Sequence, residues 1–212
     1  MFDSNSYHHI YNRGAHKALV FQDGLDYWRM LKLLYIANNE DPFDMFKLGH
    51  LDIFSIKRKC VLVDIIAYCL MPNHVHIVVR DRGEASPPGA SIKFIHKLMT
   101  GYSGYFNKKY DHSGTVWQGP YNSKPVCDEQ YFNVLIDYVH LNPYGIITPN
   151  MTKEARAERR EEAVEFSRNY EYSSYKDRLG ISRLQSCILG EARPPWTGEA
   201  SPPPNPTPSN TS

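Results

Sequence analysis

The sequence predicts an α+β fold in one domain of ordinary size, and three observations carry that prediction. Of its 212 residues, 42% are hydrophobic and 22% are charged, which are values of a globular chain. Three segments repeat apolar residues with the period of an α-helix, and two β-branched apolar runs are separated only by a tight turn. Helix-like and strand-like segments alternate along the chain, which is typical of a mixed fold.

The expected elements follow one another from the N-terminus. The segment 6–13 runs into a turn at Gly14 and is expected to be a strand. An amphipathic helix is expected over 23–37 with Asp23 as its N-cap, and residues 38–59 lose this periodicity, which indicates an insertion. The series is completed by adjacent strands at 61–70 and 74–79, a helix at 91–107, a strand at 121–126 and a helix at 128–141.

This order is the ferredoxin-like βαββαβ arrangement, an antiparallel sheet with an added C-terminal helix, and we expect it to fill residues 1–150. A helical extension is expected over 151–189, where 152–168 form a helix of balanced charge. Residues 190–212 hold seven of the fifteen prolines and are expected to be a disordered tail.

Composition excludes several classes of protein. No apolar run approaches the length of a membrane span and the N-terminus lacks a secretory pattern, so we expect a cytoplasmic protein without a membrane partner. The four cysteines are scattered without Cys-x-x-Cys spacing, which argues against a zinc site. The formal net charge of +1 taken alone argues against a polyanionic partner.

His74 and His76 stand at the start of a predicted central strand. Strand side chains alternate between faces, so both imidazoles are expected on the same side, where they form half of a divalent-metal site. A third ligand must come from elsewhere. The alternative is a structural histidine pair without a metal.

Tyr138 and Asn142 lie four residues apart on the last predicted helix and so share a face. A phenol beside a carboxamide could act as a nucleophile next to a metal ligand. Because the unperturbed pKa of tyrosine is about 10, the phenol would need a nearby cation or a base. The alternative is a ring that packs in the core.

Three separated motifs together resemble a known family. They are LMPNHVHIVV at 70–79, GTVWQGPY at 114–121 and DYVHLNP at 137–143, and they resemble single-tyrosine HUH transposases of the IS200 type, more closely their REP-associated tyrosine transposase branch. The resemblance extends to Asn12-Arg13-Gly14 and to YSSY at 172–175. The IS200 enzymes usually carry Gln where this chain has Asn142, whereas Asn is the form in the REP-associated branch.

The resemblance implies a function and a set of residues. His74, His76 and Asn142 would hold a divalent metal, Mg²⁺ or Mn²⁺, and Tyr138 would be the nucleophile. It would attack a phosphate of DNA to give a 5′-phosphotyrosine and a free 3′-OH. The family works as a homodimer on single-stranded DNA near hairpins, so we expect both partners here.

A basic and aromatic stretch over 91–124 is the predicted DNA-binding region. It carries five lysines against one aspartate, interleaved with aromatic rings, and this composition suits a single-strand platform. The alternative is a solvated lysine face with core rings. The candidate DNA-binding residues are Arg13, Lys93, Lys97, Lys108, Lys109, Trp117 and Lys124.

Two other functions stay open at this point. One is a hairpin-DNA or RNA binding module without turnover, and the other is a metal-dependent nuclease that uses water. A hexapeptide repeat is also unexplained: GEASPP occurs at 83–88 and 198–203, and nearly so at 190–195. It reflects either low-complexity drift or, by our hypothesis, translated copies of a genomic hairpin repeat.

Overall fold

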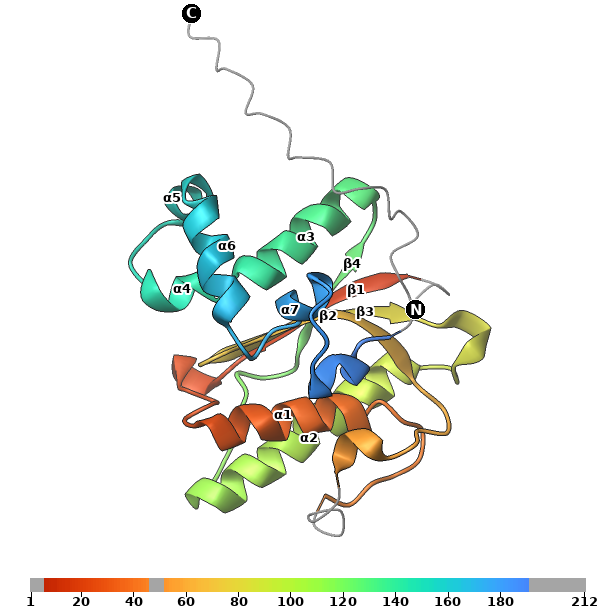
Figure 1. The fold of residues 1–212 in the computed structure, drawn as a ribbon. Coiled ribbons are helices and arrows are strands. Elements are labelled where there is room, and N and C mark those ends of the chain that lie inside the picture. The colour runs from red at the N-terminus through yellow and green to blue at the C-terminus, as the bar shows by residue number, and fades with distance from the viewer. Residues whose placement is uncertain (1–5, 46–51, 191–212) are drawn as a thin grey trace, which may run out of the picture.

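The computed structural model describes residues 6–45 and 52–190 of the chain. Within these ranges four antiparallel strands form one sheet in the order β2-β3-β1-β4, which confirms the predicted ferredoxin-like α+β topology (Figure 1). The main elements are β1 (Tyr7–Arg13), α1 (Gly24–Ile36), β2 (Val63–Met71), β3 (His74–Asp81), α2 (Ala90–Tyr110), β4 (Asn122–Val126), α3 (Glu129–Leu141), α4 (Tyr144–Ile147), α5 (Lys153–Glu158), α6 (Arg160–Asn169) and α7 (Tyr175–Arg178).

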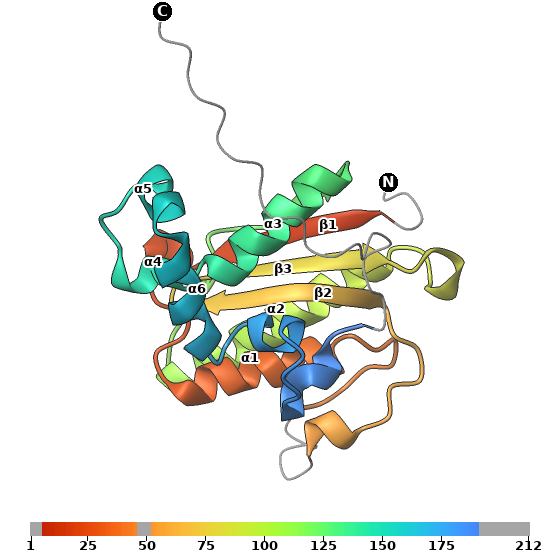
Figure 2. The ribbon, with the colours of Figure 1, turned by 45° about the horizontal axis from the view of Figure 1, so that its top comes forward.

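Helices cover both faces of the sheet. Helices α1 and α2 pack against one face and α3 against the other (Figures 1 and 2). The alternation of side chains along β3 explains both layers, because Val75 and Ile77 join the cluster under α1 and α2 while Val78 joins the cluster under α3. His74 and His76 are in phase with Val78 and therefore also face α3.

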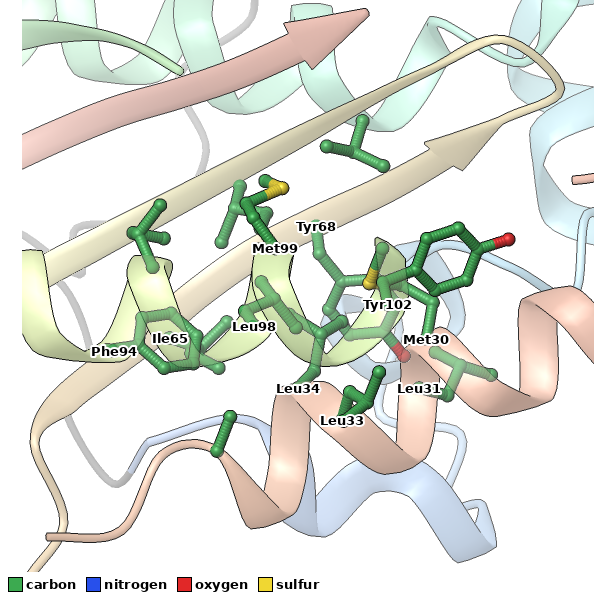
Figure 3. Close-up of a cluster of buried hydrophobic side chains, with 14 of the residues drawn as sticks. Met30, Leu31, Leu33, Leu34, Ile65, Tyr68, Phe94, Leu98, Met99 and Tyr102 are labelled. Carbon is green, nitrogen blue, oxygen red and sulfur yellow. The ribbon is translucent and has the colours of Figure 1, made fainter. Parts of the chain in front are cut away.

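The larger apolar cluster holds α1 and α2 on the sheet (Figure 3). Its side chains are almost entirely shielded from water, and burying each large apolar side chain contributes about 1.5–3 kcal/mol. This layer is the rigid support for the opposite face. Its central members are Met30, Leu31, Leu33 and Leu34 of α1, Ile65 and Tyr68 of β2, and Phe94, Leu98 and Tyr102 of α2.

The predicted N-caps are confirmed. The Asp23 carboxylate accepts hydrogen bonds from the backbone N–H groups of Leu25 and Asp26, and the Asp26 side chain completes a capping box. At the start of α3, Asp128 accepts a 2.7 Å hydrogen bond from the N–H of Tyr131. These side chains fix where each helix begins.

Asp26 also links α1 to α2, and it is fully buried. Its carboxylate accepts hydrogen bonds from Lys109 Nζ at 2.7 Å, from the Tyr110 hydroxyl at 2.7 Å and from the Tyr105 hydroxyl at 2.9 Å. Burial alone would raise the pKa of Asp26, but these bonds and one from the N–H of Gln22 hold that pKa below its ordinary value.

The described parts of the connection between α1 and β2 pack against the domain. Asn38 accepts hydrogen bonds from the N–H groups of Leu62 and Val63, and the Tyr35 hydroxyl donates to the carbonyl of Ile56. A short 3₁₀ helix, Ile53–Ser55, lies within the connection. These hydrogen bonds hold the described ends of the connection against the domain, although its sequence has no helical or strand periodicity.

The extension differs from the single helix expected over 152–168. The helix is broken between α5 and α6 at Arg159, whose φ of −103° and ψ of 41° are not helical. Beyond α6, the chain runs along the edge of β2, where the N–H of Leu70 donates to the carbonyl of Tyr172 and the N–H of Ser174 donates to that of Tyr68. This pairing covers the sheet edge.

Some expectations fall outside the described ranges. The predicted tail beyond residue 190 and the second and third hexapeptide copies lie there, apart from Gly190. The first copy, Gly83–Pro88, includes a 3₁₀ turn between β3 and α2. Among the described residues, no helix has the length and apolar character needed to cross a membrane.

Replacing Asp26 with Asn should destabilise the fold by about 1–3 kcal/mol, because it removes the charge from a buried carboxylate that accepts a charge-assisted hydrogen bond from Lys109. Urea denaturation measures this, and Asp111→Asn at the exposed end of α2 is the control. The depressed pKa of Asp26 means that its contribution is present above the unfolded pKa and is lost as the pH falls through the lower folded value. The wild type should therefore lose more stability than Asp26→Asn below about pH 4. Equal acid sensitivity of the two proteins would contradict this account.

Candidate functional site

The two histidines of β3 lie side by side on the face that α3 covers. Their ring centroids are 5.0 Å apart. The register with β1 sets His74 opposite Arg13 and His76 opposite Tyr11, and side chains paired in this way point to the same face. The centre of the sheet therefore carries a row of polar groups beneath α3.

Helix α3 brings the other two predicted residues to this row. The ring of Tyr138 lies 5.3 Å from that of His76, between centroids, and Asn142 Oδ1 lies 3.3 Å from His74 Nε2. Tyr138 is 40% exposed, whereas the core tyrosines Tyr68 and Tyr102 are fully buried. One chain thus brings together the proposed nucleophile and the proposed ligands.

Hydrogen bonds fix which ring nitrogens face the site. His74 Nδ1 lies 2.6 Å from Asn73 Oδ1, which can only accept, so Nδ1 carries the proton and Nε2 keeps a lone pair. His76 Nδ1 lies 2.9 Å from His9 Nε2, and when it donates there its own Nε2 is free to act as a ligand. A hydrogen bond at Nδ1 thus orients each imidazole, an arrangement that is common for metal-ligating histidines.

Burial keeps these imidazoles neutral. It lowers the pKa of His74 to about 4, partly opposed by the Asn142 oxygen, which would accept a hydrogen bond from the protonated ring, and assisted by the charge of Arg13. Burial also places the pKa of His76 well below its ordinary value, and the neighbouring His74, His9, Arg13 and Lys153 add to the effect. At neutral pH both rings therefore offer lone pairs rather than positive charge.

The donor set fits a cation. With the proton of His74 on Nδ1, the Nε2 lone pair and the Asn142 oxygen are two acceptors that face each other across 3.3 Å, and a bound cation would satisfy both. Two imidazoles with an amide oxygen suit Mn²⁺ better than Mg²⁺, which prefers an all-oxygen shell. The described residues hold no group of three or more His, Cys, Asp or Glu side chains that could hold a metal ion.

His9 is a site residue that the sequence did not single out. It lies on β1 in phase with Tyr11, and burial together with the charge of Lys124 lowers its pKa to about 4. Its ring stacks on that of His76 with centroids 5.1 Å apart. The only sequence signal was its alternation with Arg13, and this becomes informative once the register of β1 against β3 is known.

The candidate DNA-binding residues fall into three groups: those near the site, those on the opposite face of the sheet, and those that make internal contacts. Lys124 of β4 lies on the side of the site, with Nζ 6.0 Å from the centre of the Tyr11 ring, and Arg13 ends β1 beside the histidines. Lys93 and Lys108 lie on α2, across the sheet from the site, and Lys93 pairs with Glu40. The others make internal contacts: Lys97 bonds the carbonyls of Asn39 and Asp41, Lys109 pairs with Asp23 and Asp26, and Trp117 is buried against Tyr102.

Polar contacts with the extension hold α3 in place. Asp137 forms ion pairs with Arg160 and Arg178, so its carboxylate is directed away from the site. One turn along, the buried ring of His140 lies with Nε2 2.8 Å from Ser174 Oγ, and burial lowers its pKa to about 3. The same hydroxyl accepts a hydrogen bond from the N–H of Tyr68, which ties the helix to the edge strand β2.

Comparisons with known proteins agree with the motifs. Residues 49–142 match the family model described as "Transposase IS200 like". The predicted relation to the IS200-like transposases is thus confirmed for this part of the chain, which holds His74, His76, Tyr138 and Asn142. The family that this region matches is one of transposases.

A solved structure is also similar, with a TM-score of 0.49 and 10% sequence identity over 95% of this chain and 90% of the other. It is described as "Structure of the REP associates tyrosine transposase bound to a REP hairpin". No protein of curated function matches the sequence.

Ser174→Ala should destabilise the protein by about 1–3 kcal/mol, because it leaves the buried N–H of Tyr68 and the ring of His140 without their shared partner. Thermal or urea unfolding measures the change. Ser103→Ala on α2 is the matched control, since its hydroxyl only donates to the carbonyl of Met99 within one helix, and it should change stability by less than about 0.5 kcal/mol. Equal effects of the two substitutions would contradict an anchoring role.

Proposed function

We propose that this protein cleaves and rejoins single-stranded DNA at hairpin repeats through a covalent bond between Tyr138 and a 5′-phosphate. The observation that carries the proposal is the accessible Tyr138 ring lying 5.3 Å from that of His76, inside a donor set completed by Asn142. The IS200-like match supports the reaction class. The hairpin substrate rests on the motifs shared with the REP-associated branch.

The reaction needs one bond exchange at phosphorus. The Tyr138 oxygen loses its proton and attacks, the bond from phosphorus to the 3′ oxygen breaks, and the departing oxygen takes up a proton to give a free 3′-OH. The phosphotyrosine keeps the energy of the broken phosphodiester, so the reverse attack by a 3′-OH rejoins DNA without an external energy source. His74, His76 and Asn142 would hold the divalent ion, which would supply Lewis-acid polarisation of the phosphate.

The charges around the site suit a phosphodiester. Arg13 and Lys124 lie on the same face of the sheet as the histidines, and we propose them as contacts to the DNA backbone. Lys93 and Lys108 on the far side would serve only a strand that wraps the domain. We leave Lys97, Lys109 and Trp117 out of the proposed interface because their internal contacts occupy them.

We propose that the protein acts as a homodimer. Since all four proposed active-site residues meet within one chain, this dimer would pair two complete sites. It would act in the cytoplasm on DNA that is transiently single-stranded.

Tyr138→Phe should abolish the covalent product while leaving the fold and the histidines intact. The test incubates the protein and Mn²⁺ with single-stranded oligonucleotides copied from hairpin repeats beside its gene, and looks for an adduct on a denaturing gel. Tyr131→Phe, on the same helix and similarly exposed, is the matched control and should form the adduct at the wild-type rate.

The outcomes separate the candidate functions. Cleavage without an adduct would favour a nuclease that uses water. Tight binding with neither product would favour a hairpin-binding module. An adduct formed by Tyr138→Phe would remove the proposed nucleophile.

His9→Phe should weaken Mn²⁺ binding by about 10–100-fold, because the ring is kept while the hydrogen bond that orients His76 is lost. Electron paramagnetic resonance of free Mn²⁺ measures the affinity in the presence of hairpin DNA. His8→Phe is the control, since His8 is the neighbouring strand residue and bonds Ser6 on the other face of β1. Wild-type affinity in His9→Phe would show that the bond does not support the ligand.

A further inference from the structure

Lys153 stands beside the proposed nucleophile, although it lies in the extension beyond the matched residues 49–142. It is the first residue of α5, and its Nζ lies 5.9 Å above the centre of the Tyr138 ring. This contact places the ammonium group at the site, over the ring of the proposed nucleophile.

The extension holds Lys153 there through contacts made by other residues. Thr152 caps α5 by accepting a hydrogen bond from the N–H of Ala155. The Arg156 guanidinium donates to the carbonyl of Thr148 at 2.9 Å, and Arg160 of α6 pairs with Asp137 at 2.7 Å. Asp137 and Tyr138 are consecutive residues of α3. The ion pair of Asp137 therefore holds the extension next to Tyr138, and Lys153 of the extension lies over the Tyr138 ring.

Three cations lie at the site. Arg13 is paired with His74 across β1 and β3, Lys124 is paired with His9 across β1 and β4, and Lys153 lies over the Tyr138 ring. Lys153 is exposed to solvent. An exposed cation next to a tyrosine and a cation-binding donor set suits an anionic substrate group between them.

We propose that Lys153 is a catalytic residue that binds a non-bridging oxygen of the phosphodiester attacked by Tyr138. This inference rests on the proposed function and extends it, because the extension then supplies part of the active site. The lysine donates a charge-assisted hydrogen bond to the oxygen, on which negative charge grows as the Tyr138 oxygen bonds to phosphorus and the 3′ oxygen departs. It keeps its own proton throughout.

The first arm of the test measures adduct formation at saturating hairpin DNA with Mn²⁺ under single-turnover conditions. Lys153→Ala should slow the step by about 10²–10³-fold, the usual loss when one donor to a developing charge is removed. Lys153→Arg, which keeps the charge, should recover most of the rate. Lys32→Ala, on α1 at the opposite face of the sheet, is the matched control and should react as the wild type does.

The second arm needs no chemistry. Binding of full-length protein to oligothymidylate is followed by fluorescence anisotropy at several salt concentrations in EDTA. Loss of one phosphate contact should reduce the slope of log K against log [salt] by about 0.7 in Lys153→Ala and by nothing in Lys32→Ala.

The results distinguish the two proposals. A wild-type adduct rate together with an unchanged salt slope in Lys153→Ala would overturn the role of Lys153 while leaving Tyr138 in place. Slow reaction in both Lys153→Ala and Lys153→Arg with an unchanged salt slope would also overturn it, since a packing role explains that pattern. If the wild type forms no adduct, the proposed function fails, and the salt slope still decides whether Lys153 meets a phosphate.

Discussion

The site depends on the strict alternation of side chains along β3, which places valine and isoleucine on one face of the strand and the two histidines on the other. Val75 and Ile77 are sealed in the apolar core, while His74 and His76 between them face α3. A slip of one residue against β1 would turn the imidazoles into the apolar cluster under α1 and α2 and would turn the valines toward α3. The burial of Val75 and Ile77 in the apolar cluster under α1 and α2 therefore fixes the register of β3, and this register places His74 and His76 on the opposite face.

Keeping two neutral imidazoles buried requires partners on the far side of each ring. Asn73 at the hairpin and His9 on β1 provide them through the Nδ1 atoms, which leaves the Nε2 atoms for the site. A buried polar group without such a partner costs about 1–3 kcal/mol. The same bonds that make burial tolerable thus orient the rings.

Helix α3, unlike α1 and α2, is held in place largely by polar contacts. It rests on the sheet through a small apolar cluster, and its outer and C-terminal contacts are the Asp137 ion pairs and the hydrogen bond between His140 and Ser174. These contacts come from residues that follow the matched region. The extension therefore helps to determine where Tyr138 and Asn142 lie, and it also carries the lysine beside them.

Sequence patterns predicted the elements well because each depends on local periodicity and capping, as at Asp23 and Asp128. They also predicted the two pairs that local geometry controls: His74 with His76 on one strand face, and Tyr138 with Asn142 on one helix face. They missed His9 and Lys153, whose positions depend on strand register and on the packing of a distant segment. The assignment of Lys109 and Trp117 to DNA stays a prediction, and composition could not reveal that Lys109 pairs with a buried aspartate or that Trp117 lies in the core.

The most direct test of this account is the site of covalent attachment. Wild-type protein reacted with hairpin DNA and Mn²⁺ is digested with protease and nuclease, and the modified peptide is sequenced by mass spectrometry. The account predicts a single modified residue, Tyr138, bearing a 5′-phosphate. Attachment at another tyrosine, such as Tyr11 with its ring 6.0 Å from that of His76, would contradict it, as would cleaved DNA with no modified peptide.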